Sequence, residues 1–184
     1  MKDILVLVTL QPLLRAIQKY ILEEDRARVD IQYCKNLNGI IDFIDKKLPS
    51  SVEVIISTPG PSFFIAQLIK KKIPILPLEY NNIDIIKSLH TALSVCPGGV
   101  AFGHYLQETQ WLDDIRKMVG QDFGNFLFGN DDATNADILR KLQGRGVRAI
   151  VGGGYICNIA QEMGFLVFPV EVNRFTVKET IHKA

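Results

Sequence analysis

The chain has 184 residues, of which 47% are apolar and 22% charged, and its formal net charge is +1. This composition excludes a disordered chain, and the near-zero charge argues against a nucleic-acid-binding surface, which needs a basic face. No apolar run approaches the ~20 residues of a membrane-spanning helix. The three cysteines, Cys34, Cys96 and Cys157, are odd in number and widely spaced, so we expect reduced thiols in a cytoplasmic protein. They lack the spacing of metal ligands, so we expect no metal, and we expect no other cofactor.

Short apolar runs alternate with amphipathic segments along the whole chain. The runs predicted as strands are residues 4–8, 29–33, 52–56, 73–78, 100–102, 123–128, 147–151 and 165–170. The segments predicted as helices are residues 12–24, 40–47, 63–71, 83–93, 108–119, 132–142, 155–163 and 176–184. We expect N-caps at Asn81 or Asn82 and at Asp131 or Asp132, and a helix end at Gly164. Such alternation predicts parallel sheets.

The second half of the chain repeats the first. Residues 77–92 read PLEYNNIDIIKSLHTA and residues 169–184 read PVEVNRFTVKETIHKA, with proline, glutamate, asparagine, histidine and alanine in register. We therefore predict an α/β protein made of two tandem similar units, residues 1–92 and residues 93–184. Each unit is expected to be a four-stranded parallel sheet with helices on both faces. Parallel sheets bind ligands at the carboxyl ends of their strands, so we expect a ligand cleft between the units.

Two turns that follow predicted strands are candidate ligand-binding sites. Ser57, Thr58 and Gly60 lie before a helix, where free N–H groups and hydroxyls suit an anion; a plain capped turn is the alternative. Gly153 and Gly154 occupy the equivalent turn of the second unit. There the missing side chains would let a ligand approach the backbone.

Three further residues are candidates for ligand contact. Tyr80 could stack on a ligand, Arg174 could clamp a carboxylate, and His104 ends the fifth predicted strand. The alternatives are surface capping for Arg174 and a hydrogen-bonded structural role for His104. Cys157 is expected to be a packed thiol.

Sequence motifs point away from catalysis. The chain lacks a phosphate-binding GxxxxGK motif and a dinucleotide-binding GxGxxG motif. No nucleophile, base and orienting residue can be assembled, so we expect no catalytic residue. Two alternatives stay open: an isomerase or lyase that uses His104 and Glu79, and a dimerisation module with a vestigial cleft.

Several segments, in order, resemble the N-terminal sensor domain of the propionate-catabolism regulator (PrpR) family. They are residues 55–66, residues 73–89 with YNNIDI, residues 100–112 with YLQET, residues 149–160 with VGGGYICNIA, and the closing FTV with its helix. The resemblance implies a cytoplasmic, non-enzymatic sensing domain of a sigma-54-dependent, NtrC-type transcriptional activator. It also implies a fold of two chelatase-like α/β units.

The resemblance also implies partners. It predicts a small-molecule effector, expected to be an anionic metabolite, and AAA+ and helix-turn-helix modules in the full-length regulator. We expect a homo-oligomer and no direct contact with nucleic acid or membrane. Many relatives have Ser-Arg-Gly-Gly-Thr where this chain has STPGP at residues 57–61. Because that arginine is absent, the resemblance does not predict 2-methylcitrate, to which the archetype responds, unless Arg174 replaces it.

Overall fold

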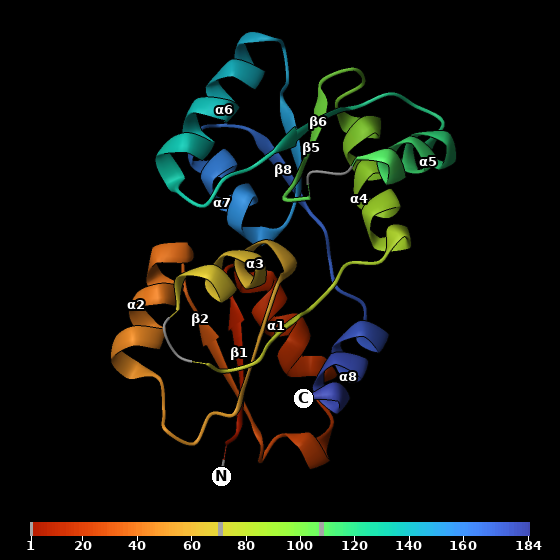
Figure 1. The fold of residues 1–184 in the computed structure, drawn as a ribbon. Helices are drawn as coiled ribbons and strands as arrows, with labels where there is room; N and C mark the ends of the chain where they lie inside the picture. Colours follow the sequence, from red (N-terminus) through yellow and green to blue (C-terminus); the bar gives the residue numbers. More distant parts are fainter. Residues whose placement is uncertain (1, 70–71, 107–108) are drawn as a thin grey trace. The chain divides into compact units, whose positions relative to one another are not determined.

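The computed structural model describes residues 2–69, 72–106 and 109–184, and it contains two four-stranded parallel sheets (Figure 1). The first sheet has the order β2-β1-β3-β4 and the second has the order β6-β5-β7-β8. The strands are β1 (Ile4–Val8), β2 (Val29–Tyr33), β3 (Val54–Ser57), β4 (Ile75–Pro77), β5 (Val100–His104), β6 (Gly124–Leu127), β7 (Ala149–Gly152) and β8 (Leu166–Pro169). The same order in both sheets confirms the predicted α/β fold of two similar units.

Helices follow the strands as predicted. They are α1 (Gln11–Tyr20), α2 (Leu37–Lys47), α3 (Pro59–Leu68), α4 (Asn82–Val95), α5 (Gln110–Val119), α6 (Asp132–Gly144), α7 (Gly154–Glu162) and α8 (Arg174–Lys183), with a 3-10 turn η1 (Glu23–Asp25). The predicted helix end at Lys71 and helix start at Glu108 lie outside the described residues.

Two helices differ from their predicted bounds by four residues at one end. The helix predicted for residues 12–24 ends at Tyr20, because Ile21 takes an extended conformation with φ −62° and ψ 130°. The helix predicted to begin at Phe63 begins at Pro59 instead. Its two prolines lie in the first turn, where the N–H groups that proline lacks would have no intrahelical acceptor.

Equivalent positions of the sequence repeat have equivalent roles at helix starts. The Asn81 side chain accepts the N–H of Asp84 at 2.8 Å, and the Asn173 side chain accepts the N–H of Thr176 at 2.9 Å. The predicted N-cap at Asn81 is therefore confirmed, and the equivalent residue Asn173 is the N-cap of α8. Gly164 has φ +87° after α7, which confirms the predicted helix end.

The compact units do not coincide with the sequence halves 1–92 and 93–184. Unit 1 consists of Met1–Tyr80 and Val172–Ala184, and unit 2 consists of Asn81–Glu171. The reason is that each half contributes its last helix to the other unit. Helix α8 contacts α1 within unit 1 (Figure 1), and α4 contacts α5, β7 and β8 within unit 2.

Helix α8 completes the hydrophobic core of unit 1. This core cluster contains alternate residues of β1, residues of α1, and residues of the C-terminal segment; among its members are Ile4, Val6, Val8, Leu13, Ile17, Val172, Val177 and Ile181. The alternation places one face of β1 against this cluster, as expected for a strand. Unit 1 therefore depends on both ends of the chain for its core.

The central strands β1 and β5 are buried along their whole length. Burial on both faces is typical of parallel sheets that helices cover on both sides. The part of the chain that the structure describes contains no helix with the length and apolar character needed to cross a membrane.

Candidate functional site

The carboxyl edge of the unit 1 sheet carries four buried hydroxyl side chains. Thr9 follows β1, Ser57 ends β3, Thr58 precedes α3 and Ser62 lies near the start of α3. Their exposed fractions are 0%, 1%, 1% and 5%. Because α/β sheets bind ligands at this edge, we treat these four residues, the hydroxyl cluster, as the candidate site of unit 1.

Two members of the hydroxyl cluster hold the loop in shape. The Ser57 hydroxyl donates to the carbonyl oxygen of Leu7 at 2.9 Å, and the Ser62 hydroxyl donates to the carbonyl oxygen of Ser57 at 2.8 Å. The Ser57 carbonyl also accepts the backbone N–H of Leu78 at 2.7 Å, which ties β3 to the segment after β4. The hydroxyl of Ser57, a residue predicted to contact a ligand, is therefore committed to the structure of the sheet edge.

Thr58 differs from these two serines. Its Oγ1 atom is buried and has no hydrogen-bond partner within the described residues. An N-cap side chain normally accepts the N–H of the second or third helical residue, but the third residue here is Pro61, and Thr58 makes no capping bond. Of the three residues that open α3, only Gly60 carries an N–H, since Pro59 and Pro61 have none.

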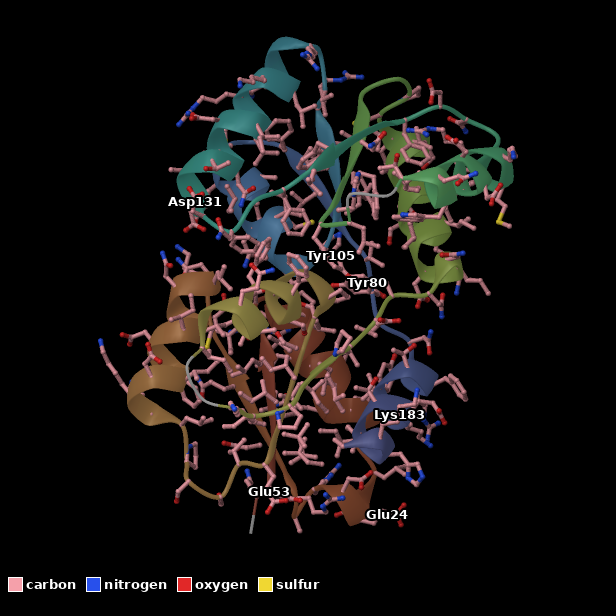
Figure 2. All side chains as sticks on the ribbon, in the orientation of Figure 1. Glu24, Glu53, Tyr80, Tyr105, Asp131 and Lys183 are labelled. Carbon is pink, nitrogen blue, oxygen red and sulfur yellow. The ribbon has the colours of Figure 1, made fainter. Side chains whose placement is uncertain are left out.

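Three other residues of unit 1 are candidates for ligand contact. Tyr80 (Figure 2) is half-buried and packs against the core cluster that α8 completes. Arg174 is exposed and is the first residue of α8. Lys35 is exposed and follows β2, at the same sheet edge as Thr58. Lys35 was not among the residues predicted from the sequence to contact a ligand.

His104, in unit 2, is held by hydrogen bonds on both ring nitrogens. Its Nδ1 lies 2.8 Å from the carbonyl oxygen of Leu106, and its Nε2 lies 3.2 Å from Nδ2 of Asn125. Arg116 donates to Oδ1 of the same Asn125 side chain at 2.7 Å, which fixes the amide so that its NH₂ faces the ring. The imidazole is therefore neutral with its proton on Nδ1, and burial lowers its pKa.

The His104 ring also packs against aromatic side chains. Its centroid lies 6.2 Å from that of Phe102 and 6.3 Å from that of Trp111. Phe102 and His104 are two residues apart on β5, so they share one face of the sheet. An enzyme that used His104 as a base would have to break its bond with Asn125, and these contacts favour the structural role.

The glycine turn between β7 and α7 is the candidate site of unit 2. Gly152 is required by packing, because a Cβ atom there would lie 2.8 Å from Cγ2 of Ile156. Gly153 is the N-cap of α7, and the helix begins at Gly154. Residues 154–156 all carry N–H groups at helical positions that have no intrahelical acceptor. The start of α7 therefore offers three backbone donors where the start of α3 offers one.

A buried polar cluster that sequence reasoning missed holds the loop before α6. Asn135 is fully buried; its Oδ1 accepts the N–H of Gly129 at 2.7 Å, and its Nδ2 donates to the Gly129 carbonyl at 3.0 Å. Asn135 Nδ2 also donates to the Tyr155 hydroxyl at 3.2 Å, and that hydroxyl donates to Asp132 at 3.0 Å. Burial is the main reason that the pKa of Tyr155 is raised, and the hydrogen bond to Asp132 raises it further. The start of α6 and the first turn of α7 are thereby tied together.

Helix α6 begins at two acidic residues. Asp131 (Figure 2) is its N-cap and accepts the N–H of Thr134 at 2.8 Å, which confirms one of the two predicted caps. This hydrogen bond lowers the pKa of Asp131. Asn135 lies further along the same helix. The one feature of the sequence that could have indicated its structural role is that asparagine is unfavourable inside a helix.

Cys157 lies in α7 and is buried. Its thiol donates to the carbonyl oxygen of Gly152 at 3.5 Å, and burial raises its pKa to about 12. A thiol with this pKa is not a nucleophile at neutral pH. These contacts agree with the packed-thiol interpretation.

The predicted ligand-binding residues fall into two loops and three separate positions. One loop holds Ser57, Thr58 and Gly60 in unit 1, and the other holds Gly153 and Gly154 in unit 2. That these loops line one cleft stays a prediction. Each loop by itself has the position expected of a ligand site in a parallel α/β sheet.

A model of the propionate catabolism activator family matches residues 23–184 and includes both loops. The chain belongs to this family. The match confirms the resemblance seen in the sequence and makes the chain a sensing domain of a transcriptional activator.

A solved structure agrees with this fold. An NtrC family transcriptional regulator from Clostridium acetobutylicum is 18% identical, with a TM-score of 0.78, and the match covers 99% of this chain and 94% of that one. One LacI-family regulator from Corynebacterium glutamicum is 12% identical, with a TM-score of 0.49, and the match covers 97% of this chain and 91% of that one. A second from the same organism is 9% identical, with a TM-score of 0.48, and the match covers 98% of this chain and 88% of that one. The match to the NtrC family regulator establishes the fold. No curated protein matches the chain.

Proposed function

We propose that this domain senses a small anionic metabolite for a sigma-54-dependent activator, and that the metabolite binds at the carboxyl edges of the two sheets. The observation that carries the proposal is the buried Thr58 hydroxyl, which has no partner within the described residues. A buried hydroxyl without a partner costs about 1–3 kcal/mol, so it calls for an explanation. A ligand that is present only in the signalling state provides one.

The charge of the expected ligand follows from the donors at these edges. The start of α7 carries three N–H groups and the positive end of a helix dipole, which together favour an anion. Lys35 adds a cation at the edge of the unit 1 sheet. Arg174 is a further cation for a carboxylate if its side chain turns toward this edge.

Helix α8 is the element that would carry the signal. It belongs to unit 1 by its contacts, and its Val177 and Ile181 side chains lie in the core cluster of that unit. A ligand at the Thr58 loop would bind the same unit that α8 completes. Binding would shift the equilibrium between conformations of unit 1 that differ in the position of α8. The size of the shift is set by the difference in the ligand's affinity for those conformations.

The remaining parts of the proposal concern the full-length regulator. We propose that it is cytoplasmic and homo-oligomeric, and that ATPase and helix-turn-helix modules on the same polypeptide respond to this domain. The domain itself is proposed to be non-catalytic, since His104 is neutral and hydrogen-bonded on both ring nitrogens.

A thermal-unfolding screen of the 184-residue chain tests the proposal. Carboxylates, phosphates and sugars are added singly, and a true ligand stabilises the folded state by RT ln(1 + [L]/Kd), ~2.7 kcal/mol at a hundredfold excess over Kd. We expect at least one compound to raise the unfolding temperature with this concentration dependence. A complete panel without a stabilising compound would contradict the proposal.

A further inference from the structure

We infer that the loop of Thr58 and Gly60 holds a single carbonyl-type oxygen of the ligand, from a carboxylate or a carboxamide, and not a phosphate or sulfate group. The inference rests on the proposed function, because it names the ligand chemistry at one of the proposed sites. It makes Thr58 a specificity-determining residue.

The hydroxyls of the loop differ in whether they have a hydrogen-bond partner within the protein. The hydroxyls of Ser57 and Ser62 each donate to a backbone carbonyl, so their protons are used within the protein. The Thr58 hydroxyl is as buried as theirs, yet it has no partner in the described part of the chain. It therefore has a proton to donate to a ligand acceptor.

The start of α3 has few backbone hydrogen-bond donors. Pro59 and Pro61 remove two of the N–H groups at the first three helical positions, and Gly60 supplies the third. The Thr58 O–H and the Gly60 N–H are two donors, which matches the two lone pairs of one carbonyl-type oxygen. Phosphate groups bind where several consecutive N–H groups converge, as at the start of α7.

The loop leads into an apolar helix and carries no cationic side chain of its own. Residues 57–62 contain no lysine or arginine, and α3 continues into apolar residues of which Phe64 and Ile65 are buried. Lys35 lies at the same edge of the sheet, but it follows β2, which β1 separates from β3. A doubly charged group without a cation beside it would lose its hydration without compensation. One oxygen of a carboxylate or carboxamide avoids this cost, because the rest of the group stays solvated or meets other residues.

Nuclear magnetic resonance on the ¹⁵N-labelled 184-residue chain tests the inference. Acetate, acetamide and inorganic phosphate are titrated separately, and the readout is the amide signal of Gly60. We expect acetate or acetamide to shift this signal saturably and phosphate to leave it unchanged. Comparison of acetate with acetamide shows whether the bound oxygen belongs to a carboxylate or to a carboxamide.

Substitutions at Thr58 identify the donor. Thr58→Val keeps the shape and removes the hydroxyl, so we expect apparent affinity for the binding probe to fall about tenfold, the effect of one hydrogen bond. Thr58→Ser keeps the hydroxyl and should retain most of the affinity. Thr91→Val makes the same chemical change at an exposed position of α4 and should have no effect.

Three results would overturn the inference: phosphate shifting Gly60 at least as strongly as the other probes, no probe shifting Gly60, or full affinity in Thr58→Val. These results are separable from failure of the proposed function. A metabolite that stabilises the chain while leaving Gly60 unshifted would overturn the inference and leave the sensing function standing. A screen without any stabilising metabolite would contradict the function, whereas the three probes would still decide the chemistry of the loop.

Discussion

The amide of Asn125 donates a hydrogen bond of 3.2 Å to Nε2 of His104, and this bond requires the imidazole to be neutral. Protonation of Nε2 would place two donors face to face. The amide cannot simply turn over, because Arg116 holds its oxygen at 2.7 Å. His104 is therefore a group that resists charging in the folded state.

Stability should fall as the pH falls below the ordinary pKa of histidine. Burial lowers the pKa of His104 from 6.5 in the folded state, so its contribution is fully present above 6.5 and is lost as the pH falls toward the folded-state value. Urea unfolding at about pH 7.5 and about pH 5 measures the loss. The loss should be smaller in His104→Gln than in the exposed control His90→Gln. Equal losses in the two variants would contradict the argument.

Removing the Thr58 hydroxyl should stabilise the protein in the absence of ligand. Thr58→Val replaces a buried group without a described partner by a methyl group, so the free energy of unfolding should rise by about 1 kcal/mol. Ser62→Ala should lower it by about 1 kcal/mol, because it breaks the bond to the Ser57 carbonyl. Urea unfolding measures both changes. A Thr58→Val variant as destabilised as Ser62→Ala would show that the hydroxyl is already satisfied.

Loss of the Asn135 side chain should be among the most costly polar substitutions. Asn135→Ala leaves the N–H and the carbonyl of Gly129 without their partner, so the free energy of unfolding should fall by about 2–3 kcal/mol. Asp137→Ala, on the exposed face of the same helix, should change it by less than about 0.5 kcal/mol. Equal effects in chemical denaturation would remove the structural role given to Asn135.

Substitutions in α8 should destabilise the sheet of unit 1. Ile181 is 3% exposed and lies in the core cluster with β1, so Ile181→Ala should cost about 3 kcal/mol and speed amide hydrogen exchange in β1. Phe175→Ala removes a larger side chain from the same helix, but Phe175 is 72% exposed and the effect should be small. Faster exchange confined to unit 2 would contradict the assignment of α8 to unit 1.

The sequence predicted local structure well and long-range packing less well. The runs at residues 4–8 and 29–33 are strands over those same residues, because an apolar, β-branched run is a local signal. The unit in which α4 and α8 each pack could not be predicted. An amphipathic pattern shows that a helix has an apolar face, but it does not show which sheet that face covers.

For the candidate site too, local features could be predicted from the sequence and hydrogen-bond partners could not. The turn at residues 57–62 was recognisable by its small residues, but only the structure distinguishes the committed hydroxyls of Ser57 and Ser62 from that of Thr58. The structural setting of His104 was partly readable, since Phe102 two residues earlier faces the same side of a strand. Asn135 bonds Gly129 in the loop before α6 and Tyr155 in α7, and the burial that makes these bonds possible is not visible in the sequence.

Amide hydrogen exchange of the chain, with and without the best compound from the unfolding screen, tests the central claim most directly. The account predicts slower exchange at residues 58–62 and 153–156, which are the two loops, together with slower exchange in α8. Protection in the loops without any change in α8 would contradict the proposed route of the signal. Protection confined to other surfaces would contradict ligand binding at the carboxyl edges of the sheets.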